Sequence, residues 1–119
     1  MSKIPKKSDY RIPPSGDRRS VPRFRFTARA EVVDHASDVV LAGRIVRISQ
    51  TGCYVNTLSA PPAGTQIRLR ITHGLDTFKS AGKVIHAEPG TGMGVEFVDI
   101  AEDQQKILSA WIAELGVPE

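Results

Sequence analysis

The 119-residue sequence has a single cysteine, Cys53, and no long apolar run. One cysteine excludes an internal disulfide and a zinc site built from several cysteines, as is typical of a reducing compartment. No stretch approaches the roughly 18 apolar residues of a membrane-spanning helix. The first residues, MSKIPKKS, lack the apolar segment of a secretion signal. We therefore expect a cytoplasmic protein that does not associate with a membrane.

Motifs that would indicate an enzyme or a metal site are also missing. The sequence contains no nucleophile elbow, no phosphate-binding glycine loop and no metalloprotease motif. Its three histidines, His35, His73 and His86, are widely separated and show no metal-ligand spacing. We predict that the protein catalyses no reaction and holds neither a metal ion nor another cofactor.

Charge is distributed unevenly along the chain. Residues 1–29 carry nine basic and two acidic residues, a balance of +7, whereas residues 30–119 carry seven basic and eleven acidic residues, a balance of −4. Such a basic arm indicates either an anionic partner or a solvated tail. Residues 1–17 are rich in proline and charge and have no apolar periodicity, so we predict a flexible leader there and one folded domain over residues 18–116.

Six short segments have the composition of β-strands. Apolar and polar residues alternate from Phe24 to Val32, a period of two that is typical of a half-buried strand. The other five segments run from about Val39 to Ile48, Cys53 to Leu58, Ile67 to Ile71, Phe78 to Ala87 and Met93 to Phe97. Turn-forming residues separate them, and this organisation predicts an antiparallel barrel or sandwich.

The period changes to that of a helix after residue 99. Asp99 and Glu102 have the spacing of a capping box, and Gly116 is placed to end the helix. The apolar stripe consists of Ile107, Leu108, Trp111, Ile112 and Leu115. We expect this C-terminal helix to cover the core rather than to form a dimer interface.

The first two strands form a hairpin whose register follows from its symmetry. Identical residues flank a turn centred on Ala36, so paired residue numbers are predicted to sum to 72. Arg23 then faces Ser49, and Arg25 faces Arg47, with Cβ atoms about 5 Å apart. Because like charges repel at that distance, the sequence predicts an anion site beside these residues.

The same register assigns an inner face to the hairpin. Its predicted inward residues include Phe24, Phe26, Val46 and Ile48. Arg44, opposite Ala28, fits this inner face poorly, so we expect Gly43 to mark a bulge.

Three motifs in this sequence resemble those of the PilZ family. Arg19-Ser20-Val21-Pro22-Arg23 matches its Arg-x-x-x-Arg motif, and Arg18 precedes it. Arg47-Ile48-Ser49-Gln50-Thr51-Gly52 matches the second motif, Asp or Asn-x-Ser-x-x-Gly, at the serine and the glycine. The segment from Gly92 to Asp99 is similar to the closing strand of the family. The resemblance covers the chain from Arg18 to Leu115.

This resemblance implies a six-stranded antiparallel β-barrel whose basic leader folds over cyclic di-GMP, a bacterial second messenger. It also implies that Arg19 and Arg23 hold phosphate and guanine atoms. Arg47 departs from the family pattern, because an arginine only donates hydrogen bonds where the family residue can accept one. We interpret Arg47 as a further phosphate contact. The predicted ligand-binding residues are Arg18, Arg19, Arg23, Arg47, Ser49 and Gly52.

The function expected from the resemblance is signalling without catalysis. Cyclic di-GMP would order residues 10–23, and the ordered segment would alter the interaction with a protein effector. Two alternatives remain at this point. A degenerate domain of this family could bind a protein partner without nucleotide, as the arginine at position 47 suggests. Nucleic acid could bind the basic arm, which we consider less favoured and which a steep salt dependence would reveal.

Overall fold

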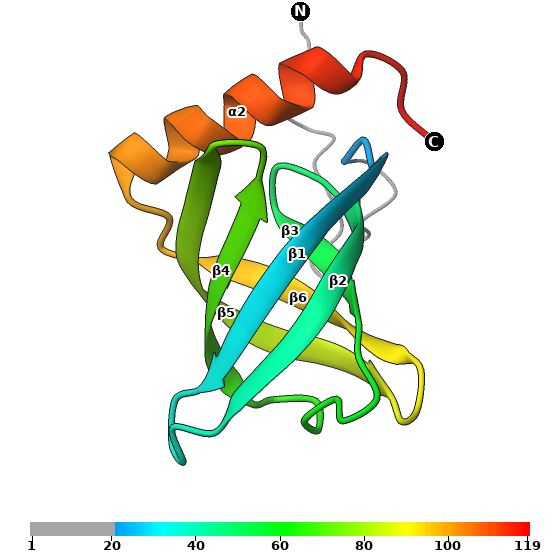
Figure 1. Cartoon of the computed structure of the whole chain (residues 1–119), viewed down its shortest axis with the longest axis vertical. Helices are drawn as coiled ribbons and strands as arrows, with labels where there is room; N and C mark the ends of the chain where they lie inside the picture. The colour runs from blue at the N-terminus through cyan, green and yellow to red at the C-terminus, as the bar shows by residue number, and fades with distance from the viewer. Residues whose placement is uncertain (1–20) are drawn as a thin grey trace, which may run out of the picture.

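The computed structural model of the protein describes residues 21–119. Six antiparallel strands close into a barrel, and one helix follows them (Figure 1). The elements are β1 (Phe24–Asp34), β2 (Val40–Ile48), β3 (Gly52–Asn56), β4 (Gln66–His73), β5 (Asp76–Glu88), β6 (Gly92–Val98) and α2 (Glu102–Leu115). The predicted fold, a six-stranded antiparallel barrel with a C-terminal helix, is confirmed.

The barrel has the strand order β1-β2-β3-β6-β5-β4 and closes by pairing of β4 with β1. Side chains alternate along β1 as the sequence predicts, with Phe26, Ala28 and Val32 buried and the intervening residues exposed. Every strand contributes such residues to one continuous apolar core. The order places β3, β6 and β5 side by side, although β4 lies between β3 and β5 in the sequence.

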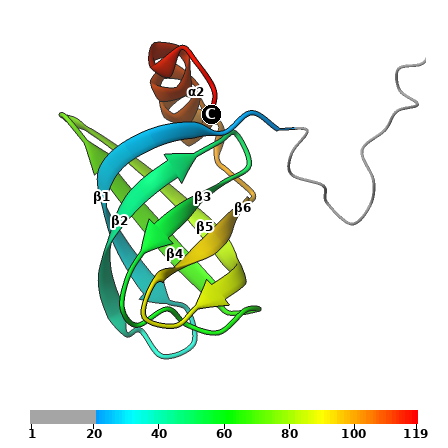
Figure 2. The same cartoon turned by 90° about the vertical axis from the view of Figure 1, so that its right-hand side faces the viewer.

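Helix α2 lies across one end of the barrel (Figures 1 and 2). Leu108, Trp111 and Ile112 are buried and belong to the same core as the strands. The Trp111 ring lies 5.4 Å from the Phe26 ring and 6.2 Å from the Phe78 ring, measured between centroids. The prediction that this helix covers the core is therefore confirmed. No helix in the described part of the chain is long and apolar enough to span a bilayer.

The predicted start of this helix is wrong. Helix α2 begins at Glu102, and its N-cap is Ala101, which makes no side-chain capping bond. Asp99 takes a left-handed conformation with φ of 51°, which aspartate tolerates better than most residues, and it forms the bend before the helix. The negative charges of Glu102 and Asp103 in the first turn instead stabilise the helix by interacting with the positive end of its dipole. Gly116, with φ of 79°, ends the helix as predicted.

The predicted hairpin register is correct at one end only. Phe24 pairs with Ile48 and Arg25 with Arg47, as the symmetry predicts, but the register shifts by one before Ala28, which pairs with Ile45. A second shift between β2 and β3 also flanks Val46.

As a result Ile45 is buried and Val46 only half-buried, so the prediction that Val46 points inward is wrong. The irregularity is at Val46 and not at Gly43, which pairs regularly with Ala30. Val46 is an extra residue of β2 relative to β3, whereas in the β1–β2 pair the extra residue is on β1, where residues 26 and 27 face Val46 alone. A bulge re-aims the strand and lets the larger Ile45 side chain fill the core.

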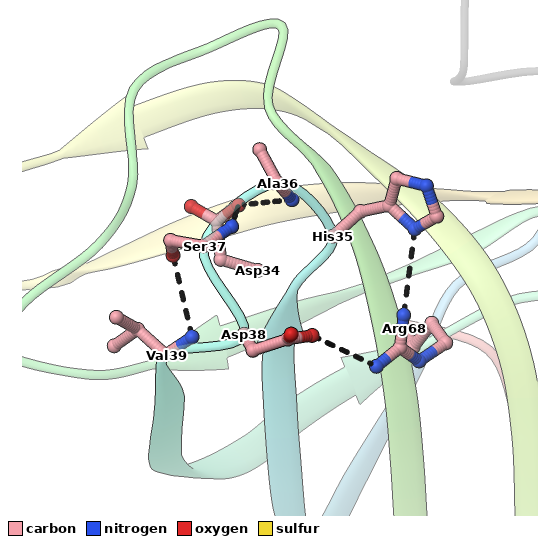
Figure 3. A network of polar contacts seen from close by, with 7 residues as sticks. All are labelled: Asp34, His35, Ala36, Ser37, Asp38, Val39 and Arg68. Atoms are coloured by element: carbon pink, nitrogen blue, oxygen red, sulfur yellow. Dashed lines mark hydrogen bonds and ion pairs between the residues drawn. The ribbon is translucent and has the colours of Figure 1, made fainter.

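The loop of this hairpin is closed by its own polar groups (Figure 3). The Asp34 carboxylate accepts hydrogen bonds from the backbone N–H groups of Ala36 and Ser37, at 2.9 and 3.4 Å. Asp38 has φ of 61° and its carboxylate lies 3.6 Å from the Arg68 guanidinium, which also contacts His35 at 3.4 Å. At this end of the hairpin Asp34 is therefore satisfied within the loop, and Asp38 pairs with Arg68 on β4.

Candidate functional site

A pocket of about 210 Å³ lies at the opposite end of the hairpin, where β1 begins and β2 turns into β3. Arg23, Arg47, Ser49 and Gly52 all line it. The two segments that the sequence predicted to converge, the residues before β1 and the second motif, therefore meet at one pocket. Arg18 and Arg19, the remaining predicted residues, lie outside the described residues.

The Ser49 side chain is buried and holds the turn between β2 and β3. Its hydroxyl oxygen accepts hydrogen bonds from the backbone N–H groups of Thr51 and Gly52, each at 3.2 Å. The hydroxyl also lies 3.3 Å from the Gly52 carbonyl oxygen, to which it can donate. This serine thus shapes the backbone that faces the pocket, a role that does not require a ligand.

Gly52 is required by the close approach of β3 and β6. A Cβ atom at this position would lie 2.2 Å from the carbonyl oxygen of Val95, a distance that no side chain tolerates. The glycine therefore brings the two strands together at the pocket wall.

Arg25 and Arg47 lie directly opposite one another on neighbouring strands, as predicted. The Glu119 carboxylate bridges them, with one oxygen 3.4 Å from Arg25 Nε and the other 3.1 Å from Arg47 Nε. In addition, the Glu119 N–H donates to the Arg23 carbonyl oxygen at 2.7 Å. The C-terminus consequently lies beside the start of β1, as both views show (Figures 1 and 2). The arginine pair already holds one anionic group.

Tyr54 and His86 form a polar wall of the pocket. The Arg47 guanidinium lies 5.8 Å from the centre of the Tyr54 ring. The Tyr54 hydroxyl donates to Glu88, and His86 Nε2 lies 3.2 Å from the other Glu88 oxygen. Partial desolvation and the bond to Glu88 raise the pKa of Tyr54 to about 12, so this phenol stays protonated at neutral pH. The hydrogen bonds from Tyr54 and His86 lower the pKa of Glu88.

The sequence analysis missed Tyr54, His86 and Glu119 as neighbours of this site. Tyr54 lies two residues after Gly52 on β3 and so shares its face, a signal that could have been used. His86 reaches the pocket because β5 lies next to β6, and β6 next to β3, an order that periodicity does not reveal. No pattern in the sequence points to Glu119.

The pocket combines cations with hydrogen-bond donors and an aromatic ring. Guanidinium groups bind phosphate oxygens through paired charged hydrogen bonds, and they also recognise the O6 and N7 atoms of guanine. Among residues 21–119, no three His, Cys, Asp or Glu side chains are grouped closely enough to hold a metal ion. The arrangement is suited to a planar, anionic ligand.

The comparisons with known proteins point to one family. A family model described as PilZ domain matches residues 17–114. The fold is similar to the PilZ domain with c-di-GMP of YcgR from Escherichia coli, with a TM-score of 0.69 and 16% identity over 83% of this chain and 92% of that chain.

Two further solved structures share the fold. For the PilZ domain of CeSA from a cellulose-synthesizing bacterium the TM-score is 0.64, with 19% identity over 80% of this chain and 98% of that chain. For the Bacillus subtilis inhibitor of motility MotI/DgrA the TM-score is 0.65, with 18% identity over 87% of this chain and 55% of that chain. A search of the curated proteins gives no match.

Proposed function

The chain belongs to the PilZ family, and from that membership we propose that the pocket beside Arg23 binds cyclic di-GMP. PilZ domains are non-catalytic receptor modules, so the protein acts by binding. The observation that carries the proposal is the meeting of Arg23 with Ser49 and Gly52 at one pocket. Those residues come from the two motifs of the family, which are separated by a whole hairpin in the sequence.

The side chains at the pocket match the two parts of such a ligand. Arg23 can grip a phosphate or the Hoogsteen edge of a guanine. Arg47 presents its guanidinium beside the Tyr54 ring and faces Arg25, so a phosphate there would take the place of the Glu119 carboxylate that now bridges the two cations. We assign Arg47 to phosphate contact, in place of the acceptor that other family members carry.

The described residues supply only part of the binding site. Their pocket of about 210 Å³ is smaller than the roughly 300 to 1,000 Å³ of sites that enclose a small molecule. In our proposal Arg18 and Arg19 complete it by closing over the ligand, and the ordered segment, residues 10–23, changes the surface that a protein effector meets. Hydrogen exchange of that segment with and without cyclic di-GMP tests this step, and unchanged exchange would exclude it.

Calorimetric titration with cyclic di-GMP, GTP and cyclic di-AMP, performed side by side, tests the proposed ligand. We expect cyclic di-GMP to bind most tightly, with a shallow salt dependence because it has only two phosphates. Equal affinity for cyclic di-AMP would show that guanine is not recognised, and a steep salt dependence would indicate a polyanion instead.

A second candidate is an interaction module that binds no nucleotide. Arg47 in place of an acidic or amide residue favours it, as does the Glu119 carboxylate that already engages Arg47. The same titration separates the two candidates. If none of the three nucleotides releases or absorbs heat, and none shifts the melting temperature, the module without nucleotide is the better description.

A further inference from the structure

A second pair of facing arginines lies further along the same two strands. Arg29 on β1 is directly opposite Arg44 on β2, and both side chains are exposed on the outer face of the barrel. Strands β1 and β2 lie side by side in both views (Figures 1 and 2). Neither arginine forms an ion pair with any residue in the described range 21–119. Neither lines the pocket described above.

Like charges placed opposite one another across two strands destabilise a sheet. The nearest acidic residue on this face of β1 is Glu31, which faces Ala42 on β2 and Arg70 on β4. Among residues 21–119 no ion pair joins Glu31 to Arg29 or Arg44, and Glu31 does not lie between them. This pair is consequently an uncompensated cationic position on an exposed sheet face.

Another pair of facing arginines in this protein shows how one carboxylate can bridge two guanidinium groups. Four residues earlier on β1, the equivalent pair of Arg25 and Arg47 is bridged by a single carboxylate, that of Glu119, which contacts both guanidinium groups. The Arg29–Arg44 pair is likewise directly opposed across β1 and β2, but no carboxylate of residues 21–119 forms an ion pair with it. Because a strand rises about 3.3 Å per residue, the two pairs are about 13 Å apart along β1.

We propose that the outer face of β1 and β2 docks an acidic segment of a protein partner, one of whose carboxylates bridges Arg29 and Arg44. The charge of the described residues favours a local contact of this kind over nucleic acid. Residues 21–119 carry ten basic and eleven acidic residues, a balance of −1. Nucleic-acid binding depends on a broad positive surface, whereas a carboxylate bridge needs only the two facing guanidinium groups. The proposal does not depend on nucleotide binding.

Fluorescence anisotropy of labelled probes tests this surface. The probes are a peptide of alternating Glu and Ser residues, the same peptide with Gln in place of Glu, and a single-stranded oligodeoxynucleotide. The full chain is compared with the double variant Arg29→Gln/Arg44→Gln. A matched control, Arg70→Gln/Lys79→Gln, removes two charges from another facing pair, on β4 and β5. Binding is measured at low ionic strength, since salt screens exposed charges.

We expect the acidic peptide to bind, the Gln peptide not to bind, and the Arg29/Arg44 double variant to lose about tenfold in affinity for the acidic peptide. The control variant should lose less than about twofold. Circular dichroism confirms that both variants fold.

If both variants lose the same affinity for the acidic peptide, binding depends only on overall charge, and the proposal is overturned. Absence of peptide binding would do the same. Tighter binding of the oligonucleotide, lost on substitution of Arg29 and Arg44, would show that the surface serves nucleic acid instead.

Discussion

At the loop end of the β1–β2 hairpin each charge has a partner, whereas at the open end the arginines outnumber the carboxylates. Arg68 contacts both Asp38 and His35, and Asp34 caps its own turn. At the open end Arg25 and Arg47 share the single carboxylate of Glu119. Polar groups that satisfy one another stabilise a local conformation, and cations that face one another are available to an outside anion. The contacts at the first end stabilise the fold, and in our proposal the second end is the one that binds a ligand.

The open end depends on the close contact of β3 with β6 at Gly52. Disrupting this contact should have the largest effect of the substitutions considered, and that effect is on stability. We predict that Gly52→Ala lowers the free energy of unfolding by about 3 kcal/mol, because the added Cβ would lie 2.2 Å from the Val95 carbonyl oxygen. Urea denaturation measures this loss. Gly94→Ala, also at the pocket, is the control, since its nearest neighbour would be 3.7 Å away. Equal stability of the two variants would refute the role given to Gly52.

The next test compares the loss of one arginine at the open end of the hairpin with the loss of one at the loop end, and it measures nucleotide affinity and stability separately. Arg23→Ala should weaken cyclic di-GMP binding about 10- to 100-fold, as expected for the loss of charged hydrogen bonds worth about 1.5 to 3 kcal/mol. Its melting temperature should hardly change, because the Arg23 side chain is exposed. Arg68→Ala, at the loop end, removes the same charge and should leave the affinity unaltered. Calorimetry of both variants decides the point, and an unchanged affinity for Arg23→Ala would remove it from the site.

The opposite behaviour is expected when the loop end is altered. Asp34→Ala removes the acceptor of two backbone N–H groups in the turn and should cost about 1 kcal/mol, a value typical of lost side-chain caps. Nucleotide affinity should stay as in the original chain. A combined measurement of urea denaturation and titration checks both statements, and a change in affinity would mean that the two ends are coupled.

The periodicity of the sequence was sufficient to predict the six strands, the helix and the Arg25–Arg47 pair. These features depend on local alternation and on the symmetry of one hairpin. The bulge at Val46 could not be predicted, because alternation allows either Ile45 or Val46 to point inward. Only the packing of the complete core favours the larger side chain.

The neighbours of the site were harder to predict than its centre. Arg23, Ser49 and Gly52 belong to segments with a recognisable spacing, and the hairpin joins them. His86 reaches the pocket through the β3-β6-β5 order, which results from barrel closure. Glu119 follows the end of the helix, where no periodic pattern constrains the chain. Long-range placement of this kind depends on the whole fold and leaves no mark in local sequence.

The comparison also predicts that unsatisfied cations at the exposed strand faces lower the stability of the barrel. Arg44→Glu would place a carboxylate opposite Arg29 and should raise the free energy of unfolding by about 0.2 to 1 kcal/mol. The same variant should lose its affinity for the acidic peptide. Thermal and urea denaturation measure the gain. A loss of stability would show that the facing arginines are not in repulsion.

At neutral pH the smallest change in the free energy of unfolding is expected for Tyr54→Phe, which removes one exposed hydrogen bond to Glu88. The alkaline range is more informative, because the pKa of Tyr54 is raised from 10.0 to about 12. Between these values the folded protein keeps a proton that the unfolded chain loses, so this tyrosine stabilises the fold below pH 10 and its contribution declines as the pH rises toward 12. The original chain should therefore lose stability more steeply over this range than Tyr54→Phe does. Urea denaturation at several alkaline pH values gives the two slopes, and identical slopes would mean that folding does not raise the pKa of Tyr54.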